Sequence, residues 1–266
     1  MKIKLSAVQK MKSKKLVVFD LDGTLAPSKS VIDAEMRELL LQLLVQKKVA
    51  VVGGGKYALF KEQLVRPLRA KAQVAKHLFL FPTTSTAFYR YNEGWKKVYS
   101  HELSKTEVKK IKETFEKVFV EIGYKHPKKT YGELIENRGT QVSFSVYGQD
   151  IVKVLGKRGV KMKEQWKEKH TPTKMKIAER VATYLPEFEV RAAGFTTIDV
   201  TKKGIDKAYG LAQIEKYVKV PIADMVFVGD SIMPGGNDYA VVRTGVDYVA
   251  IAEPGETKQV IRGLLA

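Results

Sequence analysis

The most regular feature of the chain is a series of short apolar runs, each bounded by charged or turn-forming residues. Such runs stand at residues 16–19 (LVVF), 49–52 (VAVV), 78–81 (LFLF) and 225–228 (MVFV), and further strand-like segments stand at 195–200 and 248–251. Unbroken apolar runs of this length are typical of strands that are buried on both faces of a parallel sheet. We therefore predict a parallel sheet built from these runs, apart from the segment at 195–200, which belongs to the middle region of the chain.

Helical patterns separate several of these strands. Apolar positions recur at helical spacing from the N-cap residue Asp33 through residue 44, and residues 207–217 show a second helical pattern. Gly53, Gly54 and Gly55 interrupt the chain directly after the second strand. The alternation of strand, helix and strand predicts an α/β core that is Rossmann-like.

The middle of the chain has a different pattern. Residues 104–107 (SKTE) form a capping-box sequence that opens an amphipathic helix. Residues 141–146 alternate between apolar and small polar side chains, as in a strand with one face that is solvated or faces a site. A further helix is predicted from Thr173. This region therefore has an α+β character.

These patterns divide the chain into two domains. We assign residues 1–83 and 202–266 to the α/β core and residues 84–201 to an inserted α+β domain, with hinges near Thr83 and Lys202. Composition turns polar after Pro82, which supports the first boundary. The chain shows no internal repeat.

Composition excludes several classes of protein. The 266 residues are 44% hydrophobic and 29% charged, which excludes a disordered chain. No cysteine is present, so disulfide scaffolds, thiolate zinc sites and cysteine nucleophiles are excluded. The sequence contains no apolar run long enough to span a membrane, and its first fifteen residues lack the apolar segment of a signal peptide. We expect a cytoplasmic protein without a membrane partner.

The chain is strongly basic, with 47 basic and 29 acidic side chains and a formal charge of +18. The excess is spread: residues 84–201 carry 23 basic and 15 acidic side chains (+8), and the rest carries 24 and 14 (+10). A nucleic-acid-binding protein concentrates such charge on one surface, beside a recognition motif that this sequence lacks. We expect no nucleic-acid partner, whereas a positive field favours a small phosphorylated substrate.

Aspartates follow two of the predicted strands. Asp20 and Asp22 follow the run at 16–19, and Asp230 follows the run at 225–228. Because the carboxyl ends of parallel strands share one edge of a sheet, we expect these carboxylates to lie together. Hard oxygen ligands grouped in this way suit Mg²⁺, which prefers carboxylates together with water and substrate phosphate oxygens.

Three segments resemble motifs of the haloacid dehalogenase (HAD) superfamily of phosphotransferases. Residues 20–25 (DLDGTL) are similar to its first motif, residues 203–207 (KGIDK) to its third, and Gly229 and Asp230 with residues 235–238 (GGND) to its fourth. They stand in the family's order, each where a loop is predicted. The resemblance implies a HAD core with an inserted cap domain, Mg²⁺ as cofactor, and phosphoryl transfer through an aspartyl-phosphate.

The resemblance also implies a role for individual residues. Asp20 would be the nucleophile, and Asp22 would protonate the leaving oxygen and then activate water. Lys207, with Lys203 as the other candidate, would neutralise the nucleophile and the transferred group. The implied metal ligands are Asp20, Asp230 and the backbone carbonyl of Asp22. The implied supporting residues, which would complete the metal shell or orient the lysine, are Asn237 and Asp238.

The second motif departs from the family pattern. The family usually places a serine or threonine after the second strand, but this chain has glycines followed by Lys56. Backbone N–H groups in a glycine turn can donate to an anion. We therefore expect Gly54, Gly55 and Lys56 to bind the phosphoryl oxygens.

Residues 84–201 resemble the α+β cap of the class IIB group, and the long fourth motif resembles that of eukaryotic-type phosphomannomutases. Arg138 matches a phosphate-binding arginine of these mutases, and Thr197 and Asp199 match their sugar-contacting serine and aspartate. Gln149 stands where they carry a second arginine. Because glutamine cannot grip phosphate bidentately, the resemblance favours a phosphatase over a mutase.

The predicted function is therefore a Mg²⁺-dependent phosphatase that acts on a small phosphomonoester, a sugar phosphate, through an aspartyl-phosphate. One alternative is a phosphomannomutase, which moves a phosphoryl group between C1 and C6 of a hexose phosphate. A second alternative is a catalytically weak HAD-fold binding module, to which the missing hydroxyl of the second motif points. The sequence leaves monomer and homodimer both open.

Overall fold

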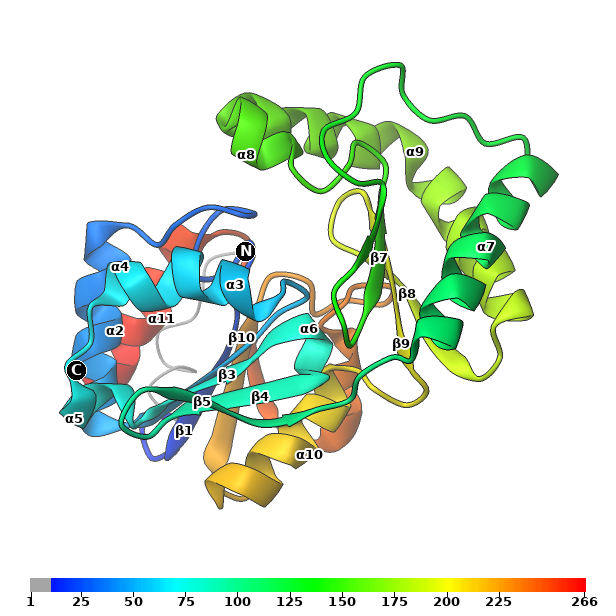
Figure 1. Ribbon diagram of the computed structural model, residues 1–266. Coiled ribbons are helices and arrows are strands. Elements are labelled where there is room, and N and C mark those ends of the chain that lie inside the picture. The colour runs from blue at the N-terminus through cyan, green and yellow to red at the C-terminus, as the bar shows by residue number, and fades with distance from the viewer. Residues whose placement is uncertain (1–10) are drawn as a thin grey trace. The chain divides into compact units, whose positions relative to one another are not determined.

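The computed structural model describes residues 11–266, so the first ten residues, which we assigned to the core, lie outside the described residues. The described chain divides into two compact units: unit 1 contains residues 11–100 and 206–266, and unit 2 contains residues 101–205. Each unit has its own sheet (Figure 1). Each unit also has its own buried apolar side chains. The mixed α/β fold, with one mostly parallel and one antiparallel sheet, confirms the predicted fold class.

Unit 1 is built on a seven-stranded sheet with the order β11-β10-β1-β2-β3-β4-β5. Its parallel strands are β1 (Leu16–Asp20), β2 (Lys48–Val52), β3 (Leu78–Phe81), β10 (Met225–Gly229) and β11 (Asp247–Ala250). All five lie where apolar segments predicted strands. Strand β1 lies between β2 and β10, with Phe19 opposite both Val51 and Val228. Its last residue, Asp20, is thereby flanked by the carboxyl ends of two further strands.

Helices cover both faces of this sheet. They are α2 (Ala34–Gln46), α3 (Tyr57–Phe60), a π-helical turn (Lys61–Val65), α4 (Arg66–Leu68), α5 (Ala72–Ala75), α6 (Pro82–Ser85), α10 (Lys207–Val218) and α11 (Pro254–Leu265), with 3₁₀ turns at Ile222–Asp224 and Tyr239–Thr244. Val17 and Phe19 pack with residues of α2 and α11, whereas Leu16 and Val18 pack with residues of α10. Because successive strand residues face opposite sides, this unbroken apolar strand is buried on both faces.

Residues 84–100, which we expected in the inserted domain, belong to unit 1. Strands β4 (Ala87–Tyr91) and β5 (Trp95–Ser100) form an antiparallel hairpin that extends the sheet beyond β3. Phe88 stacks on Phe81 of β3 with ring centroids 4.5 Å apart, so its burial joins the hairpin to the core. The polar residues after Pro82 are thus a turn between neighbouring strands of one sheet.

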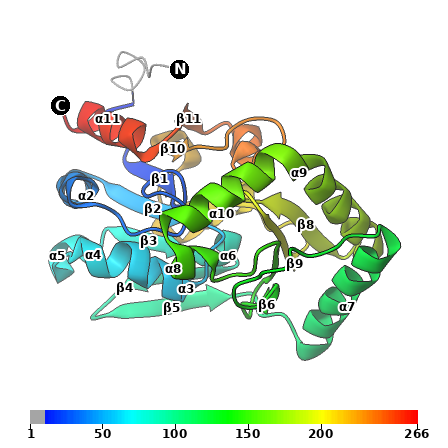
Figure 2. The ribbon, with the colours of Figure 1, turned by 90° about the horizontal axis from the view of Figure 1, so that it is seen from above.

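Unit 2 contains a four-stranded antiparallel sheet with the order β6-β7-β9-β8. Its elements are α7 (Lys105–Glu121), β6 (Ile135–Asn137), β7 (Val142–Ser145), α8 (Ile151–Leu155), α9 (Lys157–Tyr184), β8 (Phe188–Ala193) and β9 (Thr197–Lys202). Phe144 and Ile198 pack with residues of α7 and α9, which lie along one face of the sheet (Figure 2). Ser143 and Asp199 alternate with these residues and therefore face the opposite side.

The start of one helix in unit 2 and the end of the unit differ from the sequence predictions. Helix α9 begins at Lys157 instead of Thr173 and passes through Pro172, with a kink at His170, where φ is −128°. A proline preceded by a polar residue is a typical helix start, but here the kink accommodates it inside a longer helix. Strand β9 continues through Lys202, which moves the end of the unit from residue 201 to residue 205.

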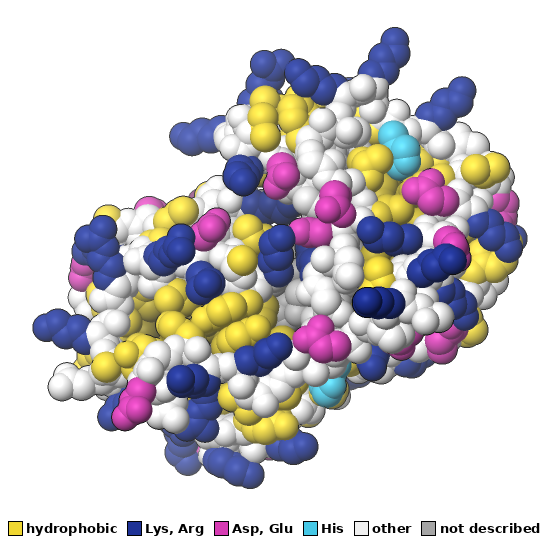
Figure 3. All heavy atoms as spheres, viewed as in Figure 1, with side chains coloured by type: hydrophobic (Ala, Val, Ile, Leu, Met, Phe, Trp, Pro, Cys, Tyr) yellow, Lys and Arg dark blue, Asp and Glu magenta, His cyan; other side chains and the backbone are white. Residues whose placement is uncertain are grey.

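Basic side chains are not gathered into one patch on the face that Figure 3 shows. On the face shown in Figure 3, lysines and arginines stand among acidic and hydrophobic side chains. This agrees with the even division of charge along the sequence. No helix within residues 11–266 is long and apolar enough to cross a membrane.

Candidate active site

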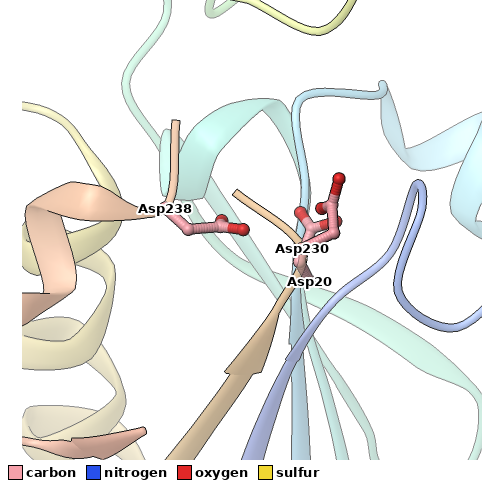
Figure 4. Close-up of side chains that lie close together, drawn as sticks. All are labelled: Asp20, Asp230 and Asp238. Atoms are coloured by element: carbon pink, nitrogen blue, oxygen red, sulfur yellow. The ribbon is translucent and has the colours of Figure 1, made fainter. Parts of the chain in front are cut away.

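Three aspartates from distant parts of the sequence meet at the carboxyl edge of the parallel sheet in unit 1. Asp20 ends β1, Asp230 directly follows β10, and Asp238 precedes the 3₁₀ turn at Tyr239–Thr244. One carboxylate oxygen from each lies within 4.8 Å of the others (Figure 4). The structure brings together the predicted Asp20 and Asp230, and it adds Asp238, which we predicted in a supporting role. We refer to these three residues as the carboxylate cluster.

Lys207 lies beside two members of the carboxylate cluster. It is the first residue of α10, and its Nζ donates to Asp20 Oδ1 at 2.5 Å and to Asp238 Oδ1. Its side chain is only 2% exposed. Asp206 caps α10 by accepting a hydrogen bond from a backbone N–H of the first turn, which fixes the start of the helix. Lys203, the other candidate lysine, is exposed and belongs to unit 2.

The loop after β1 passes close to Asp230 because it contains a glycine. Gly23 has a φ of +92°, and a Cβ at this position would stand 2.8 Å from Asp230 Oδ2. Both the conformation and the contact require a residue without a side chain. Thr24 Oγ1 donates to Asp230 Oδ1 at 3.5 Å. The Gly-Thr pair of the first motif therefore packs against the carboxylate of the fourth.

The carboxylate cluster carries more negative than positive charge. Burial raises the pKa of Asp20 well above its usual value; Lys207 opposes this rise, whereas Asp238 and Asp230 add to it. Burial also raises the pKa of Asp230, and Asp238 adds to the rise. Burial alone would lower the pKa of Lys207, but the attraction of Asp20 and Asp238 outweighs it and leaves the pKa raised. Three carboxylates beside one ammonium leave two negative charges uncompensated when all four groups are ionised.

A divalent cation fits this arrangement. The donors of the cluster are all carboxylate oxygens, which hard cations such as Mg²⁺ prefer, and the excess charge matches that of a divalent ion. Asn237 Oδ1 is also buried, and it has no hydrogen-bond partner among residues 11–266. Because buried polar oxygens are nearly always paired and Asn237 directly precedes Asp238 in the chain, this oxygen is a candidate ligand atom.

The side chain of Asp22 is not part of the carboxylate cluster. Its Oδ1 accepts hydrogen bonds from the backbone N–H of Lys29 and from Nε2 of Gln63, the latter at 3.4 Å. We had expected Asp22 to meet a metal through its backbone carbonyl, and the observed contacts leave its carboxylate apart from the cluster.

Gln63 is a residue that the sequence did not lead us to expect beside Asp22. It is 3% exposed and lies on the π-helical turn after α3. The available signal was its position: Gln63 follows the apolar Phe60 by three residues and precedes Leu64, so it interrupts an apolar helical stripe.

The glycine loop (residues 53–56) follows β2 at the same edge of the sheet. Strand β2 pairs directly with β1, and Val52 lies opposite Asp20. The backbone N–H groups of Thr83 and Thr84 donate to carbonyl oxygens of the glycine loop, each at 2.9 Å. Both threonines adopt left-handed φ values, 48° and 56°, which are rare for β-branched residues. A strained turn after β3 therefore holds the glycine loop in place.

In unit 2, the predicted phosphate-binding residue Arg138 is engaged by neighbouring side chains. It donates through Nε to Glu136 Oε2 and through Nη2 to Gln149 Oε1, both at 2.8 Å. Gln149 in turn donates through Nε2 to the carbonyl of Ser143 at 2.9 Å. Gln149 therefore contacts the guanidinium group of Arg138 and supplies no second positive charge.

The other two predicted substrate residues of unit 2 lie on β9. Thr197 and Asp199 are two residues apart on this strand, so their side chains share one face of the sheet. Asp199 lies opposite Ser143 of β7 and accepts a hydrogen bond from its hydroxyl. Thr197 Oγ1 donates to the carbonyl of Ala193 at 2.6 Å.

Comparison with known sequences finds a family and several relatives. The sequence pattern of the haloacid dehalogenase-like hydrolases matches residues 17–243. A phosphomannomutase from Encephalitozoon cuniculi is 26% identical over 259 residues, which cover 92% of this chain and 91% of the relative. Phosphomannomutase 1 from Mus musculus is 27% identical over 237 residues, which cover 86% of this chain and 84% of the relative.

Comparison with solved structures finds the same fold. The IMP-bound, N-terminally truncated IMP-nucleotidase from Plasmodium falciparum superposes with a TM-score of 0.70 at 16% identity, covering 98% of this chain and 70% of that one. A haloacid dehalogenase-like hydrolase from Bacteroides thetaiotaomicron superposes with a TM-score of 0.61 at 15% identity, covering 94% of this chain and 98% of that one. At these identities the likeness is one of fold.

Proposed function

The chain belongs to the haloacid dehalogenase-like hydrolases, and from this membership we propose that it is a Mg²⁺-dependent phosphatase that cleaves a small phosphomonoester through an aspartyl-phosphate. The observation that carries the proposal is the buried pair of Asp20 and Lys207 within the carboxylate cluster. Such a pair places a nucleophilic carboxylate oxygen beside a fixed positive charge at the carboxyl edge of a parallel sheet.

Asp20 is the nucleophile in the proposed reaction. One of its carboxylate oxygens forms a bond to phosphorus while the bond from phosphorus to the leaving oxygen breaks, and the electron pair of that bond stays with the leaving oxygen. Lys207 holds positive charge 2.5 Å from Asp20 Oδ1 throughout, which stabilises the charge-rich transition state. The N–H groups of the glycine loop donate to the phosphoryl oxygens.

Asp22 moves the proton in both halves of the reaction. It gives a proton to the leaving oxygen in the first step, and in the second it takes a proton from the water that attacks the aspartyl-phosphate. The water oxygen forms a bond to phosphorus while the bond from phosphorus to Asp20 breaks, and the electron pair of that bond returns to the Asp20 carboxylate. Phosphate leaves, and both aspartates return to their starting states.

The residues that would hold Mg²⁺ are Asp20, Asp230 and the backbone carbonyl of Asp22, with Asn237 and Asp238 in support. The excess negative charge of the carboxylate cluster and the buried oxygen of Asn237 support this assignment. When bound, Mg²⁺ supplies positive charge that offsets the repulsion between these carboxylates and a phosphate dianion.

We propose a sugar phosphate as the substrate and unit 2 as the cap domain that selects it. The relatives named phosphomannomutase support this substrate class, because they align with most of the chain. In unit 2, Arg138, Thr197 and Asp199 are the proposed substrate contacts.

A phosphomannomutase is the second candidate. The same relatives favour it, since several proteins of that name match over at least 85% of this chain. Against it stands Gln149, which contacts the Arg138 guanidinium and adds no positive charge. A mutase must hold a bisphosphate by its distal phosphate, which calls for cations at that position.

The deciding experiment incubates the purified protein with Mg²⁺, mannose 1-phosphate and glucose 1,6-bisphosphate and follows free phosphate and hexose 6-phosphate separately. Free phosphate without hexose 6-phosphate supports the phosphatase; hexose 6-phosphate with little free phosphate overturns it in favour of the mutase. The Asp20→Asn variant should abolish either product, whereas Asp247→Asn, at an aspartate whose side chain is 53% exposed, should not. Neither product from the wild type, with these or other phosphate esters, would leave a binding module.

A further inference from the structure

Gln63 is a buried polar residue that the proposed reaction has not used. It is 3% exposed and stands between Phe60 and Leu64, which are fully buried. Its backbone carbonyl accepts a hydrogen bond from the N–H of Ile32 at 3.0 Å, which joins this turn to the loop after β1. A glutamine in such surroundings is costly unless its amide group has partners.

The amide group of Gln63 points at Asp22. Its Nε2 lies 3.4 Å from Asp22 Oδ1, and the backbone N–H of Lys29 donates to the same oxygen. Two N–H donors thus converge on one of the two carboxylate oxygens. An oxygen that accepts two hydrogen bonds keeps its lone pairs engaged, so a proton on this carboxyl group resides on the other oxygen, Oδ2.

Gln63 lies in the middle of a π-helical turn. The backbone N–H of Arg66 donates to the carbonyl of Lys61, five residues earlier, instead of four as in an α-helix. Such single π-helical turns inside helices occur frequently at functional sites. Gln63 contacts Asp22 from this turn, whereas Phe60 and Leu64 belong to the apolar core.

We propose that Gln63 is a positioning residue, which orients the carboxyl group of Asp22 so that Oδ2 delivers the proton to the leaving oxygen. The inference rests on the proposed phosphatase activity and on the role of Asp22 in it. As the bond from phosphorus to the leaving oxygen breaks, the proton passes from Asp22 Oδ2 to that oxygen, and Oδ1 stays bound to Gln63 and Lys29. In the second half, Oδ2 receives the proton of the attacking water.

The test uses the dependence of rate on the leaving group. A poor leaving group, such as the alkoxide of a hexose 6-phosphate or glycerol phosphate, needs the proton, whereas p-nitrophenolate leaves without one. In Gln63→Met, which keeps the volume of the side chain and removes its N–H donors, we expect kcat on alkyl phosphates to fall about tenfold to a hundredfold. We expect kcat on p-nitrophenyl phosphate to fall less than about threefold, because the transfer to Asp20 itself is intact.

Gln42→Met is the matched control, because it makes the same chemical change at an exposed glutamine of α2 and should leave both rates unchanged. Gln63→Asn keeps the amide but withdraws it by one methylene, and it should show the same selective loss if the methionine variant does not fold. An active wild type whose Gln63 variants lose activity equally on both substrate classes, or on neither, overturns this inference alone. A wild type that hydrolyses no ester overturns the proposed function and this inference together.

Discussion

Replacing Lys207 by methionine is expected to destabilise unit 1 strongly. Methionine fills nearly the same volume, so the main change is the loss of a positive charge that is 2% exposed and contacts two buried carboxylates. Removal of one partner from a buried ion pair typically costs about 3–5 kcal/mol, because the remaining charge stays buried without compensation. Here two carboxylates lose their counter-charge, so we expect the upper half of this range in the absence of divalent metal.

The measurement is urea unfolding followed by tryptophan fluorescence in EDTA. The chain has two tryptophans, Trp95 in unit 1 and Trp166 in unit 2, so a Trp166→Phe background leaves one reporter in unit 1. A loss of about 4–5 kcal/mol corresponds to a midpoint shift of about 1.3–2.5 M urea, if the slope of the unfolding free energy against urea is about 2–3 kcal/mol/M. Lys216→Met, at an exposed lysine of the same helix, should stay within about 0.5 kcal/mol of the wild type.

Two further variants make the reasoning refutable. Adding Asp238→Asn to Lys207→Met removes one of the uncompensated carboxylates and should recover part of the lost stability. Mg²⁺ should also recover part of it, because the cation takes over the compensation of charge. A loss below about 1 kcal/mol in EDTA would show that Lys207 does not stabilise unit 1 by compensating the charge of the carboxylates. If Mg²⁺ recovered none of the lost stability, the assignment of a Mg²⁺ site to the carboxylate cluster would be wrong.

Three other outcomes follow from the structure. Removal of Mg²⁺ from the wild type should lower the free energy of unfolding of unit 1 by about 2.7 kcal/mol if the ion was present at a hundred times its dissociation constant, and titration calorimetry would give that constant. Gly23→Ala should destabilise unit 1 by about 1–3 kcal/mol and weaken Mg²⁺ binding, because its Cβ would lie 2.8 Å from an oxygen of Asp230; urea unfolding and calorimetry measure the two effects. In unit 2, burial lowers the pKa of Lys174 from 10.5 to about 8, with help from the nearby Lys167. The unfolded chain therefore binds more protons than the folded chain between pH 8 and 10.5, so the stability of unit 2 should rise over this window by at most about 3 kcal/mol. Lys174→Met should remove this rise with pH, and urea unfolding followed by Trp166 fluorescence at several pH values measures it.

The sequence predicted four of the parallel strands of unit 1, β1, β2, β3 and β10, because burial on both faces leaves a continuous apolar run. Strand β1 is such a run, and the placement of Asp20 at its end follows from it. Asp230 was predictable from its position after a strand that shares the sheet edge with Asp20, whereas Lys207 was implied only by the resemblance of residues 203–207 to the third motif. The structure places both side chains beside Asp20.

The placement of the β4–β5 hairpin and the contact of Gln63 could not be predicted, because the local sequence does not say which part of the fold each one packs against. Strands β4 and β5 mix buried and exposed residues, and such a hairpin pairs with either unit on the evidence of its sequence alone. In the structure, the pairing of β4 with β3 and the stacking of Phe88 on Phe81 join the hairpin to unit 1. Gln63 could not be predicted for a related reason. A single polar residue on the apolar face of a helix does not indicate its partner, and only the structure shows that Gln63 contacts Asp22.

The pairing of β1 with β10 has a consequence for how the chain folds during synthesis. Leu16 pairs with Met225, so the strand that carries Asp20 stays without one of its neighbours until almost the whole chain has left the ribosome. Unit 2, by contrast, is one continuous segment and is complete at residue 205. We expect unit 2 to fold before the sheet of unit 1 is complete, because domains generally fold as units in the order in which they leave the ribosome. The edge of the sheet that carries the carboxylate cluster is then completed late, and a chain that ends before β10 cannot form the cluster.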